Sequence, residues 1–228
     1  MLGNVFILGD SYSTFKGYIP EGHQPYYAPT GPDYIINHPE LTLNDNDVYD
    51  VTKTWWYNLA TENGSLLLNS SWSGSTICNT GYGGEDYSNK SFTKRIENLI
   101  AEDYFKKNRV DTFFLFGGTN DSCADAPLGE KIYSGWTKED LYHVFPAFTF
   151  LIDLLLKTIP DAKIYCIINT ELKPEIVDFY RSVCEKNDIG AIELHDIEKI
   201  WGHPTVKGMA QIKEQILEFI NKQTEDNQ

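Results

Sequence analysis

Two residues far apart in the sequence have the types that nucleophilic chemistry needs. Ser11 follows the apolar run 4–8 and the pair Gly9 and Asp10, so its hydroxyl is expected just past the carboxyl end of a buried strand. Open α/β sheets bind ligands and place reactive groups at such strand ends, which makes Ser11 a candidate nucleophile. His203, near the other end of the chain, is a candidate general base for the proton of this hydroxyl.

The same chemistry needs hydrogen-bond donors for an oxygen that becomes negative in the transition state. The side-chain amide of Asn120, in the polar segment 117–121, is one candidate, and the backbone N–H groups of Ser11 and Gly74 are two others. Three further glycines remain alternatives to Gly74: Gly81, Gly83 and Gly84. A hydroxyl, an imidazole and such donors together suit acyl transfer through a covalent intermediate.

Strands and helices are expected to alternate along the chain. Strands are predicted at 4–8, 65–69, 110–116, 162–168 and 191–194, and helices at 55–62, 92–107, 141–158, 174–186 and 206–221. This alternation predicts an α/β fold with a doubly wound parallel sheet. The strand order 2-1-3-4-5 would bring the ends of the first three strands together, and with them the segments that carry Ser11, Gly74 and Asn120.

A long stretch from about residue 12 to 53 has no sustained period of either 2 or 3.6 residues. Loops of this length are uncommon in compact domains and are usually functional, so we expect a lid or a substrate wall. Its aromatic side chains could stack on sugar or aryl groups, or could pack the loop onto the body: Tyr12, Phe15, Tyr18, Tyr26, Tyr27, Tyr34 and Tyr49. No linker divides the chain, which predicts one domain over residues 1–228 with this stretch as an insertion.

The composition favours a neutral or cationic small-molecule ligand. With 33 acidic and 19 basic residues the net charge is −14 at pH 7, which repels nucleic acid and anionic membranes. The four cysteines lie far apart and outside any Cys/His pattern of zinc spacing, so no metal site is predicted: Cys78, Cys123, Cys166 and Cys184. Free thiols fit a cytoplasmic location if the chain is complete, whereas removal of a signal peptide would imply a secreted or periplasmic protein.

The four parts taken together resemble the SGNH, or GDSL-like, hydrolases, which are named for a Ser, a Gly, an Asn and a His in four sequence blocks. The blocks match in the right order over almost the whole chain, as Gly9-Asp10-Ser11, Gly74, Gly117-x-x-Asn120-Asp121, and His203-Pro204 with Gly208 following. The resemblance implies a flavodoxin-like three-layer α/β/α sandwich with a five-stranded parallel sheet. It also implies hydrolysis of esters through an acyl-enzyme, with no metal or nucleotide cofactor.

One position departs from the family pattern. The family usually has an Asp three residues before the His, where this sequence has Ile200. Such an acid holds the tautomer of the imidazole and stabilises the imidazolium, so another group must support His203 here. The carbonyl of Ile200 or Trp201 could do so, or an acid could reach in from a neighbouring loop: Asp196, Glu198 or Glu171.

The leading hypothesis from the sequence is a serine esterase that removes a small acyl group, such as acetyl, from a carbohydrate or similar polyol. A lipase-like or thioesterase activity uses the same chemistry and stays open. Two alternatives come from other classes of protein: a flavodoxin-like protein whose hydroxyl-rich segment 9–14 binds phosphate or a cofactor, and a carbohydrate-binding relative without activity. The sequence predicts neither the oligomeric state nor the pathway.

Overall fold

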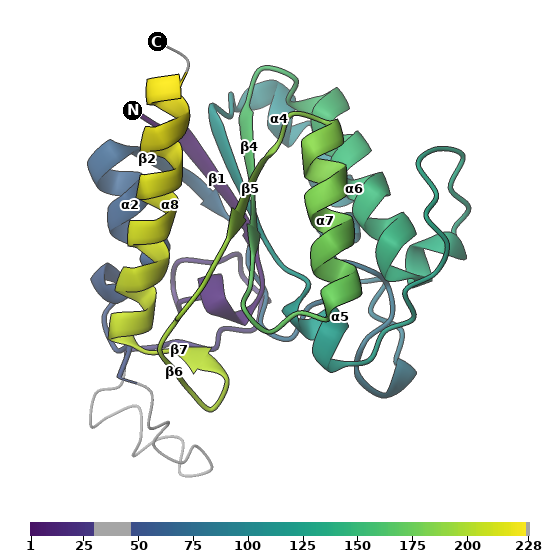
Figure 1. Cartoon of the computed structure of the whole chain (residues 1–228), viewed down its shortest axis with the longest axis horizontal. Coiled ribbons are helices and arrows are strands. Elements are labelled where there is room, and N and C mark those ends of the chain that lie inside the picture. Colours follow the sequence, from purple (N-terminus) through teal and green to yellow (C-terminus); the bar gives the residue numbers. More distant parts are fainter. Residues whose placement is uncertain (30–46, 227–228) are drawn as a thin grey trace.

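The computed structural model describes residues 1–29 and 47–226. Five parallel strands form one sheet: β1 (Gly3–Gly9), β2 (Gly64–Asn69), β3 (Thr112–Phe116), β4 (Lys163–Ile168) and β5 (Gly190–Glu193). Their order is β2-β1-β3-β4-β5, so the predicted strand order is confirmed. The carboxyl ends of β1, β2 and β3 therefore meet at one edge of the sheet (Figure 1).

Helices cover both faces of this sheet and make it the middle layer of a three-layer α/β/α sandwich (Figure 1). One face carries α2 (Trp55–Asn63) and α8 (Val206–Asp226), and the other carries α3 (Phe92–Ala101), α6 (Val144–Thr158) and α7 (Pro174–Lys186). Two short helices follow α3 and β3, namely α4 (Tyr104–Lys107) and α5 (Thr119–Cys123). A separate apolar cluster fills the space between the sheet and each helical layer.

The first strand is apolar on both faces because helices pack against both. Val5 and Ile7 belong to the cluster under α2 and α8, whereas Phe6 and Leu8 belong to the cluster under α3, α6 and α7. All four side chains are fully buried. Burial of one such side chain contributes roughly 1.5–3 kcal/mol relative to an exposed one, so β1 is a stable support for the residues that follow it.

Several element boundaries differ from the sequence predictions for local reasons. The helix predicted at 92–107 is two helices, because Asp103 adopts a left-handed φ of 57° between α3 and α4. The helix predicted from residue 141 begins at Val144, because a 3-10 turn (η4, Asp140–Tyr142) precedes it. The third strand begins at Thr112 rather than at 110, and α8 continues beyond the predicted end at 221.

The insertion predicted at about 12–53 is described only in part, since residues 30–46, Tyr34 among them, lie outside the described residues. Tyr12, Phe15 and Tyr27 are buried, with exposed fractions of 2, 2 and 3%. These three rings therefore pack against the body of the protein. The lid function and the single-domain assignment stay predictions. Among the described residues, we find no helix with the length and apolar character needed to cross a bilayer.

Candidate active site

Ser11 and His203 lie in direct contact at the edge of the sheet where β1 ends. Asp10 follows β1 and caps a 3-10 turn (η1, Ser11–Ser13) by accepting a hydrogen bond from the N–H of Tyr12 at 3.1 Å. The Oγ of Ser11 lies 3.0 Å from Nε2 of His203. A separation of this size allows the imidazole to take the proton of the hydroxyl. Ser11 is 6% exposed, so its hydroxyl lies in a confined place.

His203 is presented by a small antiparallel hairpin that the sequence analysis missed. Its strands are β6 (Lys199–Ile200) and β7 (His203–Pro204), joined by Trp201 and Gly202 with φ angles of 52° and 75°. Strands of two residues are too short to produce a hydrophobic period. The turn glycine before His203 is the single local signal that could have indicated this hairpin.

Two tyrosine hydroxyls hold the hairpin against the rest of the site. Tyr12 donates a hydrogen bond to the carbonyl of Gly202, and Tyr27 donates to the carbonyl of Pro204 at 2.9 Å. Both rings are buried, and a buried polar group left without a partner costs about 1–3 kcal/mol. These bonds therefore fix the hairpin as well as satisfying the two phenols. Sequence analysis gave neither tyrosine this role, because a Tyr in an irregular segment carries no signal of its partner.

The second ring nitrogen of His203 contacts a backbone carbonyl. Nδ1 lies 3.2 Å from the oxygen of Trp201. A hydrogen on Nδ1 can be donated to this carbonyl, which leaves Nε2 as the acceptor for the Ser11 hydroxyl. This is the tautomer that a general base for Ser11 needs. The carbonyl support considered for Trp201 is therefore present.

The three acids considered as supports of His203 contact other side chains. Each lies beside a basic residue: Glu171 beside Lys199 at 3.2 Å, Glu198 beside Lys207 at 2.9 Å, and Asp196 beside His195 at 3.2 Å. Burial lowers the pKa of His203 below its ordinary 6.5, Lys199 adds to this shift, and the Trp201 carbonyl and Glu171 oppose it. Glu171 thus acts on the imidazole through its charge. A supporting role for the three acids stays a prediction.

Asn120 lies in the first turn of α5, where two hydrogen bonds fix its amide. The helix begins after Gly118, which has a left-handed φ of 98°, and an added Cβ there would lie 2.7 Å from the Leu172 side chain. Nδ2 of Asn120 donates to the carbonyl of Ser75 at 2.9 Å, and Oδ1 accepts from the hydroxyl of Tyr82 at 2.8 Å. The amide therefore keeps one N–H hydrogen for a ligand oxygen.

Two backbone N–H groups are the remaining candidate donors. In the described part of the chain, the N–H groups of Ser11 and Gly74 have no protein acceptor. Gly74 has a φ of 75°, which favours glycine, and nothing lies within 4 Å of where its Cβ would be. The alternatives Gly81 and Gly84 donate within their own loop, to the carbonyls of Glu85 and Gly81. Gly83, the third alternative, has a φ of 65° and, among the described residues, no backbone acceptor for its N–H. Gly74 and Gly83 therefore remain candidate donors, and the choice of Gly74 stays a prediction.

A buried arginine ties the ends of β1 and β2 together. Arg95, on α3, is 4% exposed and donates hydrogen bonds to the carbonyls of Gly9 and Ser70 and to the hydroxyl of Ser75. Burial lowers the pKa of Arg95 to about 9, and the Asp10 carboxylate opposes this shift. Burial also raises the pKa of Asp10 to about 7, and Arg95 opposes that rise. Each of these two buried groups therefore favours the charged form of the other, directly beneath the candidate site.

A second buried acid, Asp121, fixes the loop that follows β2. Its carboxylate accepts hydrogen bonds from the N–H of Ile77 at 2.9 and 3.0 Å and from the N–H of Cys78 at 3.0 Å. Burial raises its pKa, and these N–H groups oppose the rise. The sequence analysis noted Asp121 only as part of its motif and did not consider Arg95. The sequence signal for a buried Arg95 is its position three residues after Phe92, which places the two side chains on the same side of the predicted helix.

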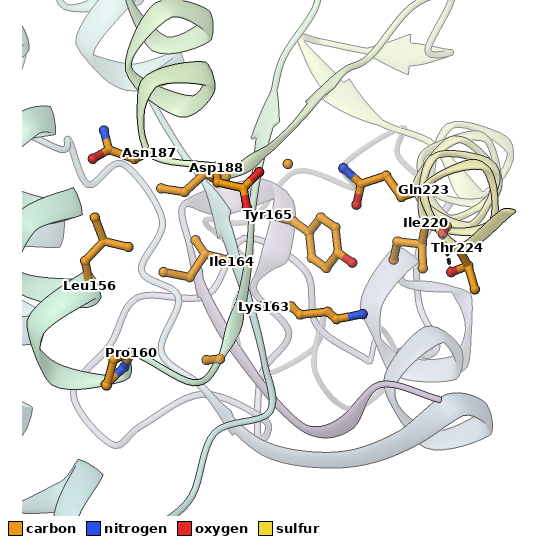
Figure 2. Close-up of a pocket in the computed structure, with 13 residues that line it drawn as sticks. Leu156, Pro160, Lys163, Ile164, Tyr165, Asn187, Asp188, Ile220, Gln223 and Thr224 are labelled. Carbon is orange, nitrogen blue, oxygen red and sulfur yellow. Dashed lines mark hydrogen bonds between the residues drawn. The ribbon is translucent and has the colours of Figure 1, made fainter. Parts of the chain in front are cut away.

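A cavity of about 680 Å³ lies at the opposite end of the sheet, where β4 and β5 begin (Figure 2). It is lined by Lys163, Tyr165 and Gly190 from the strands and by Ile220 and Thr224 from α8. Because the strands are parallel, their starts lie away from the end of β1, and this cavity is separate from the candidate site. No imidazole lines it. Among the described residues, no group of three or more His, Cys, Asp or Glu side chains could hold a metal ion.

Comparisons with known proteins show which proteins this chain is similar to. The family model of the GDSL-like lipases and acylhydrolases matches residues 3–220. A Bacteroides ovatus protein described as a GDSL-like lipase is 42% identical, with a TM-score of 0.86 over 97% of this chain and 99% of that one. A similarly described protein from Bacteroides uniformis is 43% identical, with a TM-score of 0.84 over 96% of each chain.

A more distant likeness concerns the fold alone. A family two carbohydrate esterase from Clostridium thermocellum, solved in complex with cellohexaose, is 18% identical, with a TM-score of 0.58. The match covers 97% of this chain and 65% of that one. A comparison with curated proteins gave no match.

The α/β/α sandwich, the serine–imidazole contact and the matching family define an ester hydrolase of the SGNH type. Its substrate is a small-molecule ester. The chain belongs to the GDSL-like lipase/acylhydrolase family.

Proposed function

We propose that this ester hydrolase removes small acyl groups, such as acetyl, from a carbohydrate or similar polyol through an acyl-enzyme on Ser11. Nε2 of His203 takes the hydroxyl proton while Oγ forms a bond to the carbonyl carbon of the ester. The carbonyl oxygen becomes negative and accepts hydrogen bonds from the N–H groups of Ser11 and Gly74 and from the Asn120 amide. His203 returns the proton to the leaving alcohol as the C–O bond breaks. A water molecule, deprotonated in the same way, then releases the acid and regenerates Ser11.

The observation that carries this proposal is the contact between Ser11 Oγ and His203 Nε2. The two residues are 192 positions apart in the sequence, yet the atoms lie 3.0 Å apart. The Trp201 carbonyl supports the neutral tautomer that accepts the proton, as a general base requires. The alternative of a phosphate-binding loop would leave the contact between Ser11 and His203 without a role.

The surroundings of His203 support a neutral alcohol with a flat apolar face. The leaving alcohol must lie beside the imidazole that returns its proton, and Trp201, two positions before His203, is 78% exposed. An exposed indole offers a large rigid contact area for a sugar ring. The net charge of −14 opposes anionic substrates, and the 6% exposure of Ser11 supports a small acyl group.

The test of this proposal is capture of the acyl-enzyme. We expect a burst of p-nitrophenol from p-nitrophenyl acetate, because an ester with a good leaving group acylates the enzyme faster than water deacylates it. After an acid quench, fragmentation mass spectrometry should place one acetyl group on Ser11. The matched control is Ser13→Ala, which removes a nearby buried hydroxyl. This hydroxyl has no hydrogen-bond partner among the described residues, so the variant should keep both the burst and the acetyl group. Turnover without an acetyl group on Ser11 contradicts the mechanism.

A screen of ester substrates then tests which alcohol part the enzyme prefers. We expect acetate release from acetylated sugars at higher kcat/KM than from simple alkyl acetates, because the sugar gains contacts beside His203 that an alkyl group lacks. Sugar binding without turnover of any ester would instead favour a binding protein that has lost activity. Preference for long-chain esters would favour a lipase-like role.

The rate should rise with pH as His203 loses its proton, because only the neutral imidazole can accept the proton of Ser11. Burial holds the pKa of His203 below 6.5, so the midpoint of kcat/KM is expected below that pH. Asp10, with a pKa of about 7, can titrate nearby, and Asp10→Asn is the control that should leave the midpoint in place. A kcat/KM that decreases as the pH is raised from about 5 to about 8 contradicts a general base at His203.

A further inference from the structure

A short part of the long loop after β1, residues 23–27, contacts both sides of the candidate site. At one end, the carbonyl of Gln24 accepts a hydrogen bond from the N–H of Ser73 at 2.8 Å. The ring of His23 stacks on Trp72, with 4.4 Å between the ring centroids and 28° between the planes. This end of the segment therefore packs on the loop after β2, which carries the candidate oxyanion donor.

The other end of the segment packs on the imidazole of His203. The ring of Tyr26 lies parallel to the imidazole, with 3.5 Å between centroids and 6° between planes. Rings this close and this parallel are in van der Waals contact over their faces. The N–H of Tyr26 donates to Oγ1 of Thr14 at 2.8 Å, and the hydroxyl of Tyr27 donates to the Pro204 carbonyl at 2.9 Å. The segment is thus held in place on both sides of the stacked ring.

We propose that Tyr26 is a positioning residue for hydrolysis: its ring holds the imidazole of His203 in the plane that directs Nε2 at Ser11, and its face stabilises the imidazolium once the proton has moved. This inference rests on the function proposed above. A parallel ring in contact restricts rotation of the imidazole about its Cβ–Cγ bond, so the base stays aligned with the hydroxyl. The face of a tyrosine ring also attracts a cation that lies within about 6 Å of its centre.

Other groups around His203 also act on its charge. Burial lowers its pKa most, Lys199 lowers it further, and the Trp201 carbonyl and Glu171 raise it. Two more tyrosine rings contact the imidazole at steep angles: Tyr12 at 5.4 Å and 60°, and Tyr27 at 6.5 Å and 80°. Of these three tyrosine rings, that of Tyr26 presents its face in parallel contact. The test must therefore remove the aromatic face at position 26 while keeping the burial of the imidazole.

The test compares two substitutions at this position. Tyr26→Phe keeps the aromatic face and should leave kcat within about twofold of the wild type. Tyr26→Leu keeps apolar bulk over the imidazole but removes the face, so kcat should fall about tenfold while KM stays within about twofold. Because burial is kept and the imidazolium is less stable, the midpoint of the pH–rate profile should move to lower pH by about half a unit in Tyr26→Leu only.

The matched control is Tyr18→Leu, which changes a tyrosine of the same loop that is 42% exposed and packs on Phe15 and Tyr57. It should leave kcat and the pH midpoint unchanged. Unfolding midpoints identify the folded variants, and Tyr26→Met replaces Tyr26→Leu if that variant does not fold. Equal losses in Tyr26→Phe and Tyr26→Leu, or a change confined to KM, overturn the positioning role.

The outcomes also separate this inference from the function on which it rests. Acetylation of Ser11 in the wild type, together with wild-type kcat and pH midpoint in Tyr26→Leu, overturns the role of Tyr26 and leaves the esterase mechanism in place. Turnover in the wild type without an acetyl group on Ser11 overturns the mechanism itself, whatever the variants at position 26 do.

Discussion

Replacement of Ser11 by alanine should lower kcat/KM for p-nitrophenyl acetate by about ten-thousand-fold or more. The variant removes Oγ, which in the proposed mechanism forms the bond to the acyl group and which lies 3.0 Å from Nε2 of His203. The Asn120 amide and the backbone donors remain, so a small residual rate above the uncatalysed reaction is expected. Initial rates with matched amounts of wild type and variant, corrected for hydrolysis in buffer, measure this loss.

The control for this experiment is again Ser13→Ala, two positions along the same 3-10 turn. Both variants remove one buried hydroxyl from η1, so a loss caused by disturbance of the turn would affect both. We expect activity close to the wild type in Ser13→Ala and unfolding midpoints close to the wild type in both. A Ser11→Ala enzyme that keeps kcat/KM within about tenfold of the wild type would eliminate Ser11 as the nucleophile.

Replacement of Arg95 by methionine should lower the free energy of unfolding by about 3–5 kcal/mol. The guanidinium is 4% exposed and donates to the carbonyls of Gly9 and Ser70 and to the hydroxyl of Ser75. Methionine has similar length but no donor, so these oxygens lose hydrogen bonds inside the protein. The carboxylate of Asp10 also loses the positive charge that opposes the rise of its pKa. Urea denaturation followed by tryptophan fluorescence gives the difference in free energy.

Two further variants make the Arg95 result specific. Lys94→Met removes a neighbouring cation of the same helix whose partner, Glu97, lies 3.9 Å away, and a half-exposed ion pair of this kind contributes about 0–1 kcal/mol. Arg95→Lys keeps the charge but loses the fork of donors, so its stability should fall between wild type and Arg95→Met. Equal stability of Arg95→Met and Lys94→Met would mean that the buried hydrogen bonds of Arg95 do not hold the strand ends together.

The same variant should also reduce activity, for a reason separate from stability. Arg95 joins the end of β1, which positions Ser11, to Ser75, whose carbonyl accepts from the Asn120 amide. Loss of this link lets the candidate nucleophile and the candidate oxyanion donors shift relative to each other. We therefore expect folded Arg95→Met to have a lower kcat than Lys94→Met at a temperature where both are folded.

The sequence by itself determined the fold class and the residues of the proposed chemistry. The segments before Ser11 and before Gly117 are continuous and apolar because helices cover both faces of the sheet. The composition of these segments alone therefore indicates that they are buried strands. The alternation of such runs with helical periods led to the strand order that the structure has. Since each strand ends where its apolar run ends, the polar residues that follow could be assigned to one edge.

The tertiary structure alone decided how these residues are held. The hairpin that presents His203 has strands of two residues, which are too short for a period, and its support is a carbonyl of Trp201, which any residue type could supply. Tyr26 meets His203 and Arg95 meets Gly9 across long separations in the sequence. Such contacts depend on how whole elements pack, because a side chain of given type can bury against many partners and its own neighbours in the sequence do not select one.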